Sequence, residues 1–207
     1  MIRTIIFLLL CLSVSGLRAQ DKGEGLIRDL ASKIAGYASY QVDFTASMDG
    51  EFGDLPGRIV VSGDRYYIDM NGMELFCDGK LLYTYNSEED EVTVEKPNPH
   101  DNSMLSNPSR FFRLSGEDFR FAYKGRAADG GKTVELIPKA ADAGYHSIRV
   151  KIEPSTGLPG RIEYYADSAG PPVEIRIGKI TPNVPVSAAT FTFDKSKHKG
   201  VEVIDFR

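Results

Sequence analysis

The sequence predicts a mainly β protein of the α+β class, and two features of its pattern carry that prediction. Apolar residues recur at every second position in several short runs, which is the period of a half-buried strand. Turn sequences such as Asn-Gly at 71–72 and Asp-Gly at 78–79 separate these runs. Because short, evenly spaced strands favour a barrel or a sandwich, we expect one large β domain over residues 21–207.

Residues 1–20 have the layout of a secretory signal peptide. Arg3 is followed by an apolar run of about a dozen residues, which is too short to span a bilayer as a permanent anchor. We expect cleavage near Ala19 or Gln20; an uncleaved membrane anchor is the alternative interpretation. Cys11 follows Leu10 rather than a small residue, so it is a poor lipid-attachment cysteine.

Charge and cysteine content restrict the possible partners and the source of stability. The chain has a formal net charge of −4, and without residues 1–20 it keeps 23 basic and 29 acidic residues, a net of −6. This sign argues against nucleic acid as a partner. Cys77 is the one cysteine beyond residue 20, so an exported protein of this sequence has no internal disulfide and depends on a packed core.

The first elements of the exported chain are a helix and a strand. Leu26, Ile27, Leu30 and Ile34 have the three- and four-residue spacing of one helical stripe. Residues 40–48 then alternate strictly between apolar and polar types, which predicts a β-strand. A glycine-rich loop over residues 50–57 is expected to follow.

The central stretch, residues 58–96, is predicted to form five short strands joined by four turns. Tyr66, Ile68 and Met70 share one face, with Arg65 and Asp69 between them. Residues at 63–64, 71–72 and 78–79 tolerate positive φ, and an acidic turn lies at 86–90. The meander therefore offers an apolar face.

Prolines and small polar residues interrupt the strand pattern from residue 97 to residue 114. Pro108 is suited to the first turn of a short helix, and Phe111 and Phe112 give the segment an apolar side. Strands are predicted to resume over 119–124, 132–138, 146–154, 160–166 and 171–180. In the tail, alternation places Phe191 and Phe193 on one face, and a last strand is expected near 201–204.

The sequence supplies no recognisable catalytic constellation. It has no G-x-S-x-G turn, no Walker loop and no dinucleotide fingerprint, and its three histidines lack partners at metal-ligand spacing. The acidic residues at 88–91 lack the spacing of a calcium loop. We therefore expect a protein without enzymatic activity, cofactor or metal.

The remaining candidates for a functional role are the large apolar side chains. Burial in an ordinary core explains any one of these side chains, and the functional alternative is that a subset lines a cavity. The candidate cavity residues are Phe44, Met48, Tyr66, Ile68, Met70, Leu75, Tyr83, Phe111, Phe112, Phe119 and Phe121.

Four segments resemble the periplasmic outer-membrane lipoprotein carrier family, the LolA-like proteins: SYQVDFTASM, FCDGKLLYTYNSEEDEVTVEK, VELIPK and AATFTFDKSKHKGVEVID. The resemblance implies an unclosed antiparallel β-barrel, a curved half-barrel whose concave face is covered by short lid helices. Residues 97–114 would form that lid. A basic residue restrains the lid in the family, and Arg65 is the nearest candidate for this latch.

The same resemblance implies a soluble periplasmic carrier that binds the acyl chains of lipoproteins. Its partners would be acylated lipoproteins, an inner-membrane lipoprotein-releasing transporter and an outer-membrane acceptor, and we expect a monomer. Two alternatives stay open. One is a sensor or scaffold of the same half-barrel fold that binds a regulatory protein, and the other is a hydrolase whose catalytic groups the sequence does not single out.

Overall fold

The computed structural model describes residues 22–47, 53–98, 103–111, 113, 116–141 and 143–207. The expected signal peptide lies outside them. Twelve strands pair in the order β12-β6-β5-β4-β3-β2-β1-β11-β10-β9-β8-β7, and the two end strands do not pair with each other. The prediction of a mainly β protein with an unclosed sheet is therefore confirmed. No helix among the described residues has the length and apolar character needed to cross a bilayer.

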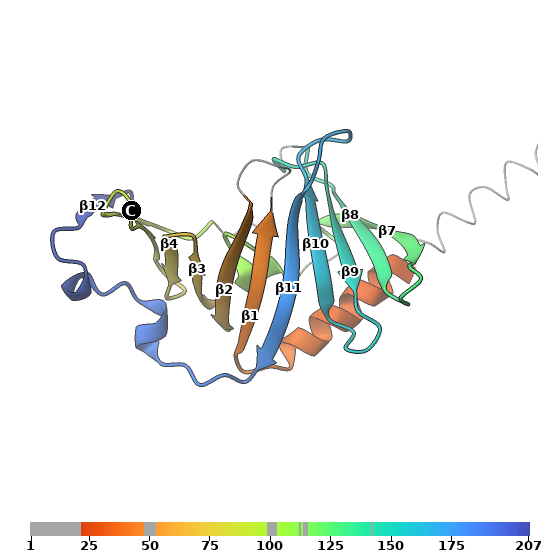
Figure 1. Ribbon diagram of the computed structural model, residues 1–207, viewed down its shortest axis with the longest axis horizontal. Coiled ribbons are helices and arrows are strands. Elements are labelled where there is room, and N and C mark those ends of the chain that lie inside the picture. The colour runs from red at the N-terminus through yellow and green to blue at the C-terminus, as the bar shows by residue number, and fades with distance from the viewer. Residues whose placement is uncertain (1–21, 48–52, 99–102, 112, 114–115, 142) are drawn as a thin grey trace, which may run out of the picture. The chain divides into compact units, whose positions relative to one another are not determined.

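The described chain divides into two compact units (Figure 1). The helix unit comprises the described parts of 1–32 and 114–174, and the meander unit those of 33–113 and 175–207. The helix unit has strands β7 (Phe119–Arg126), β8 (Lys132–Pro138), β9 (Ser147–Ile152) and β10 (Pro159–Tyr165). The meander unit has β1 (Tyr40–Ser47), β2 (Asp54–Ser62), β3 (Arg65–Met70), β4 (Met73–Cys77), β5 (Leu82–Asn86), β6 (Glu91–Glu95), α2 (Pro108–Phe111), η1 (Ala188–Phe191), η2 (Lys195–Lys197), β12 (Glu202–Asp205) and nearly all of β11 (Val173–Pro182).

In the helix unit, the predicted helix covers the apolar face of the antiparallel strands (Figure 1). The helix runs over residues 22–35, and a Cβ at Gly23 would lie only 3.2 Å from Cβ of Phe121 and 3.3 Å from Cγ1 of Val134. The ammonium of Lys22 lies 3.9 Å from the ring centroid of Tyr123. Ile27 and Leu30 of the predicted apolar stripe are buried, so the helix contributes these side chains to the core of the unit.

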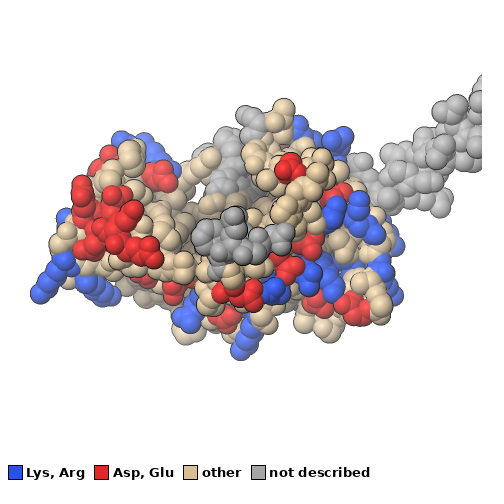
Figure 2. All heavy atoms as spheres, turned by 45° about the horizontal axis from the view of Figure 1, so that its top comes forward, with Lys and Arg blue, Asp and Glu red and all other residues tan. Residues whose placement is uncertain are grey.

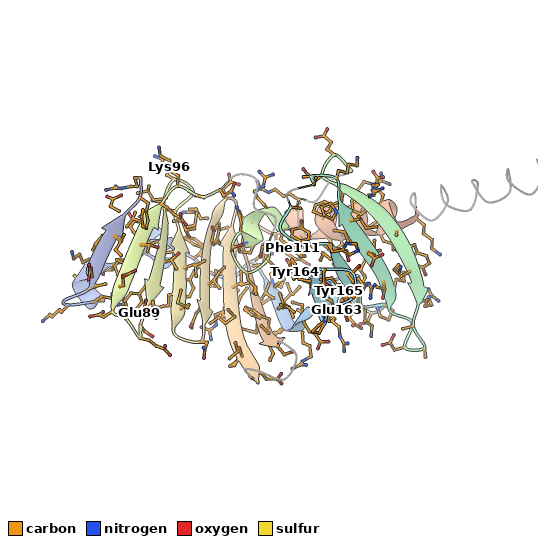
Figure 3. The ribbon with its side chains drawn as sticks, turned by 90° about the horizontal axis from the view of Figure 1, so that it is seen from above. Glu89, Lys96, Phe111, Glu163, Tyr164 and Tyr165 are labelled. Carbon is orange, nitrogen blue, oxygen red and sulfur yellow. The ribbon has the colours of Figure 1, made fainter. Side chains whose placement is uncertain are left out.

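The other face of the same strands carries an ion-pair network. Glu135 on β8 accepts hydrogen bonds from Arg149 at 2.9 Å and from Lys124 at 3.2 Å. Arg149 also donates to the hydroxyl of Tyr165 at 2.9 Å, and that hydroxyl donates to Glu163 at 3.0 Å. Tyr165 and Glu163 are labelled in Figure 3. Burial acts to raise the pKa of Glu135, but the hydrogen bonds from Arg149 and Lys124 hold that pKa below its usual range.

The meander unit contains the five strands and four turns predicted for residues 58–96. Each of β2 to β5 pairs antiparallel with the next strand, and the predicted strand over 40–48 is present as β1. Asn71 and Gly72 both have positive φ, at 49° and 79°, so the Asn-Gly turn has the form that joins two strands without splaying them. Local turn chemistry therefore sets the register of the meander.

The prediction of a loop over residues 50–57 is wrong for residues 54–57, because β2 begins at Asp54. Pro56 and Gly57 form strand pairs with Thr45 and Phe44. The Phe44 ring lies across Gly57, and a Cβ at Gly57 would clash with Cζ of that ring. A glycine typical of a loop is thus used here to seat an aromatic ring on the neighbouring strand.

The C-terminal segment packs on one face of the meander rather than forming the expected strand at Phe191 and Phe193. Phe191 ends the 3-10 helix η1, and Phe193 lies in a buried cluster with Tyr85, Val92 and Val201, against which Phe76 and Tyr83 also pack. We call this group the outer-face cluster. The last strand is confirmed as β12, which pairs parallel to β6. The segment therefore covers an apolar face that the strands alone would expose.

Candidate functional site: an apolar wall beneath a short helix

Strand register assembles an apolar wall on the face of the meander opposite the outer-face cluster. One row runs across four strands through the paired residues Val42, Ile59, Ile68 and Leu75. A second row begins with Tyr40, Val61 and Tyr66, and a third includes Phe44, Met70 and Met73. We call these ten residues the inner wall. Directly paired side chains on one face are in contact distance, so the rows form a continuous surface.

The inner wall is covered at its centre and partly exposed at one side. Tyr66 and Ile68 are each 1% exposed, and Val42 and Ile59 are buried completely. Met70, Met73 and Leu75 are only half-buried. The wall is therefore neither an open groove nor a sealed core along its whole length. Any guest that used its centre would have to displace what covers it.

The short helix α2 contacts β2 and β3 and covers part of the inner wall within this unit. Its start is set by Asn107, whose carbonyl accepts from the backbone N–H of Arg110 at 3.1 Å and of Phe111 at 3.2 Å. Pro108 opens the helix, as predicted. Phe111 is 2% exposed (Figure 3). The predicted short helix in the broken segment is thus confirmed, and its aromatic side chain is buried.

The ion pair that ties this segment to the meander was not expected from the sequence. Arg113, two residues after α2, pairs with Asp64 in the β2–β3 turn at 2.7 Å. Both side chains are more than half exposed, so the pair contributes at most about 1 kcal/mol. The sequence marks Asp64 only as a turn residue, because nothing local indicates a partner 49 positions away.

Arg65, the predicted lid latch, is oriented away from α2. Strand alternation places it on the face opposite Tyr66, where its guanidinium carbon lies 5.0 Å from the ring centroid of Phe191. Its Nη2 donates to Ser62 at 3.4 Å. The contacts of Arg65 are therefore with η1 and the end of β2, whereas Asp64 makes the ion pair with Arg113.

The remaining predicted cavity residues fall into four groups. Phe44, Tyr66, Ile68, Met70 and Leu75 are on the inner wall. Tyr83 is not: it pairs with Phe76 and packs on Phe193, on the outer face, which corrects its assignment to the cavity. Phe119 and Phe121 are buried on β7 in the helix unit. Met48 and Phe112 lie outside the described residues.

Half of the inner wall was absent from the predicted set: Tyr40, Val42, Ile59, Val61 and Met73. Tyr40 and Val42 were visible in the alternation of 40–48, whereas Ile59 and Val61 lie in a strand whose first residues are typical of a loop. The register of β1 on β2 is what places Val42, Ile59 and Val61 beside Ile68 and Tyr66. The predicted set contains no valine, and these smaller β-branched side chains complete the surface.

The titratable groups near the wall do not form a reactive arrangement. Cys77 ends β4 and is buried, and that burial raises the pKa of its thiol, which disfavours the nucleophilic thiolate. His198 stacks on Phe193 with 4.7 Å between ring centroids. Among the described residues, no group of three or more histidine, cysteine or acidic side chains is placed to hold a metal ion.

Two comparisons by sequence match the same kind of protein. The family model described as outer membrane lipoprotein carrier protein LolA matches residues 67–194. An outer-membrane lipoprotein carrier protein of Dechloromonas aromatica (strain RCB) is 32% identical over 120 residues, which is 56% of this chain. The match spans 54% of the relative, so about half of its length is compared.

Solved structures support the fold. A protein from Thermus thermophilus, described as an uncharacterized conserved protein, superposes with a TM-score of 0.59 at 11% identity, covering 86% of this chain and 96% of its own. A putative outer membrane lipoprotein-sorting protein domain from Vibrio parahaemolyticus gives a TM-score of 0.51 at 13% identity and covers 84% and 97%. At these identities the likeness concerns the fold alone.

Proposed function

Because the chain belongs to the family of outer membrane lipoprotein carrier proteins, LolA, we propose that it is a soluble periplasmic carrier of acylated lipoproteins. In this role it binds acyl chains without chemistry and moves them from the inner to the outer membrane. A lipoprotein-releasing transporter of the inner membrane supplies the cargo, and an outer-membrane acceptor, a protein or the membrane itself, receives it. Export by a signal peptide at residues 1–20 accounts for the location of the carrier between the two.

The observation that carries this proposal is the inner wall beneath α2. An acyl chain gains about 0.8 kcal/mol for each methylene removed from water, so a wall that spans four strands suffices for capture. The half-buried residues Met70, Met73 and Leu75 provide the first contact, and the methionines adapt to the varied shapes of flexible chains.

The buried centre of the wall makes displacement of the cover part of binding. α2 has four residues, which is too short to be stable on its own, so its place on β2 and β3 depends on the burial of side chains such as Phe111 and on contacts such as the exposed Asp64–Arg113 pair. A segment this short can leave without unfolding the strands beneath it. The chain's own Phe111 and the guest then compete for one surface, which limits net affinity and favours release.

Extraction of bound lipid from protein purified from its native compartment, with identification by mass spectrometry, tests the proposal. We expect acylated lipoprotein or its acyl fragments with the native protein, and a reduced yield with Leu75→Gln, which places an amide on a half-buried position of the wall. The control is Val203→Gln on β12, which is 43% exposed and far from the wall in the strand order. Equal yields from both variants, or no acyl material from any, would contradict the proposal.

A further inference from the structure

A pocket of about 340 Å³ lies at one edge of the meander unit, and its charged lining is mostly cationic. Lys80 comes from the β4–β5 turn, Lys96 from the residue after β6, and Arg110 and Arg113 from α2 and the residues that follow it. Asp64 is the one carboxylate among the described lining residues, and Arg113 already pairs with it at 2.7 Å. The pocket thus concentrates positive charge in a chain whose net charge is −4.

The sheet brings these cations together from positions far apart in the sequence. Because neighbouring strands run antiparallel, the start of β3, the end of β4 and the end of β6 lie at the same end of the strands. α2 packs against β3. Figure 3 shows Lys96 at this end, with Glu89 at the opposite end of the β5–β6 hairpin. Figure 2 shows acidic side chains gathered at the left of the view, with basic side chains above and below them.

Arg110 adds an independent sign that the pocket has a ligand. Its Nε is buried and has no hydrogen-bond partner among the described residues. Buried donors almost always have an acceptor, and an arginine N–H without one is unusual. The neighbouring polar groups bond to one another instead: Ser109 donates to the Asn107 side-chain oxygen at 2.8 Å, and the Asn107 amide donates to the Asn98 carbonyl at 3.3 Å.

We propose that this pocket binds a phosphate group, carried by a free phosphate ester or by a phospholipid headgroup. Cations approach from three separate segments, and a tetrahedral phosphate can accept from several directions at once, whereas a planar carboxylate presents two oxygens in one plane. The volume is at the lower end of the range for small-molecule sites, about 300–1,000 Å³, which fits a glycerophosphate-sized group.

The inference goes beyond acyl-chain transport and does not depend on it. Tyr66 belongs to both the pocket lining and the inner wall. The cations, however, lie at one end of the strands, whereas the wall lies on one face of the sheet. Failure of acyl capture, measured with Leu75→Gln, would leave phosphate binding standing. Failure of phosphate binding would likewise leave the carrier proposal untouched.

Calorimetric titration of the purified protein with sn-glycerol 3-phosphate at low ionic strength tests the site. We expect Lys80→Gln combined with Lys96→Gln to weaken binding about tenfold or more, since both lysines donate charge-assisted hydrogen bonds to the anion. Both are exposed, so their replacement spares the fold, and an unchanged unfolding midpoint verifies this. The matched control is Lys195→Gln with Lys199→Gln, which removes the same charge from exposed positions of the C-terminal segment.

Two further arms identify the source of the phosphate and the specificity. Titration with succinate should give at least tenfold weaker binding than glycerol 3-phosphate. Sedimentation with phosphatidylglycerol vesicles, compared with phosphatidylcholine vesicles, shows whether a headgroup enters the pocket: lysine-dependent sedimentation assigns the headgroup, and its absence alongside glycerol 3-phosphate binding assigns a free ester. Equal binding by the pocket and control variants, succinate binding as tight as phosphate, or no binding to any phosphate probe would overturn the proposal.

Discussion

Replacing Phe111 by alanine should raise the affinity of the protein for palmitate, because the cover and the guest compete for the inner wall. A buried phenylalanine truncated to alanine loses about 3–5 kcal/mol of packing free energy. Because Phe111 is 2% exposed, its side chain is almost completely buried, and its truncation should lose at least the lower value of about 3 kcal/mol. Since α2 is four residues long, this loss falls on the local equilibrium between covered and uncovered wall rather than on the whole domain.

The size of the gain follows from that local equilibrium. Lowering the cost of uncovering the wall by about 3 kcal/mol increases the uncovered fraction, and with it the apparent affinity, by up to about 100-fold. The gain is smaller if the covered state is favoured by less than that amount. Calorimetric titration with palmitate measures it directly, and urea unfolding of the same variant should show a much smaller fall in global stability.

Phe119→Ala is the matched control for this experiment. Phe119 is the same residue type, is 1% exposed and lies on β7 in the helix unit, whereas α2 belongs to the meander unit. Its truncation should lower the free energy of unfolding by about 3–5 kcal/mol and bring no gain in palmitate affinity. If Phe111→Ala behaved in the same way, α2 would be a fixed part of the core and the reasoning about a displaceable cover would be refuted.

Four other substitutions test the surrounding structure. Glu135→Gln should lower the free energy of unfolding by about 1–2 kcal/mol at pH 7, and it should flatten the loss of stability below about pH 4.5. A carboxyl whose pKa is lowered by folding contributes stability that is fully present above its unfolded pKa and is lost as the pH falls through its folded pKa; urea unfolding at several pH values measures both effects. Gly57→Ala should cost about 1–3 kcal/mol through its clash with Phe44, whereas Gly25→Ala, a helical position with open space, should gain about 0.5–1 kcal/mol in the same unfolding assay. Phe193→Ala should lower the unfolding midpoint through the outer-face cluster while leaving palmitate titrations unchanged.

The strands of the meander could be predicted because their signals are local. Alternation over residues 40–48 and 65–70 fixes which side chains share a face, and Asn71, Gly72 and Gly79 adopt the positive φ that their turns require. Each of these signals depends on neighbours within a few positions. The error at 54–57 has the same origin, because the local pattern around Pro56 and Gly57 indicates a loop and only the Phe44 ring explains them as strand residues.

The candidate site was harder to predict because both faces of the meander are apolar. Tyr66 and Ile68 on one face and Phe76 and Tyr83 on the other are equally suited to line a cavity. Only the C-terminal segment, more than 100 residues later, decides that Tyr83 belongs to a covered outer face. The cations of the pocket pose the same problem, since Lys80 and Arg110 lie 30 positions apart and meet only through the sheet.

The energetics of the inner wall also constrain how cargo would leave. A 16-carbon chain fully transferred from water gains about 12 kcal/mol, whereas the return of Phe111 to the wall recovers only about 3 kcal/mol. The cover therefore lowers the cost of departure without making departure into water favourable. Because transfer of an acyl chain into water stays unfavourable even when Phe111 returns to the wall, release needs an acceptor that buries the chain again. Direct transfer to a membrane or to a second apolar site is the step that the cover can assist.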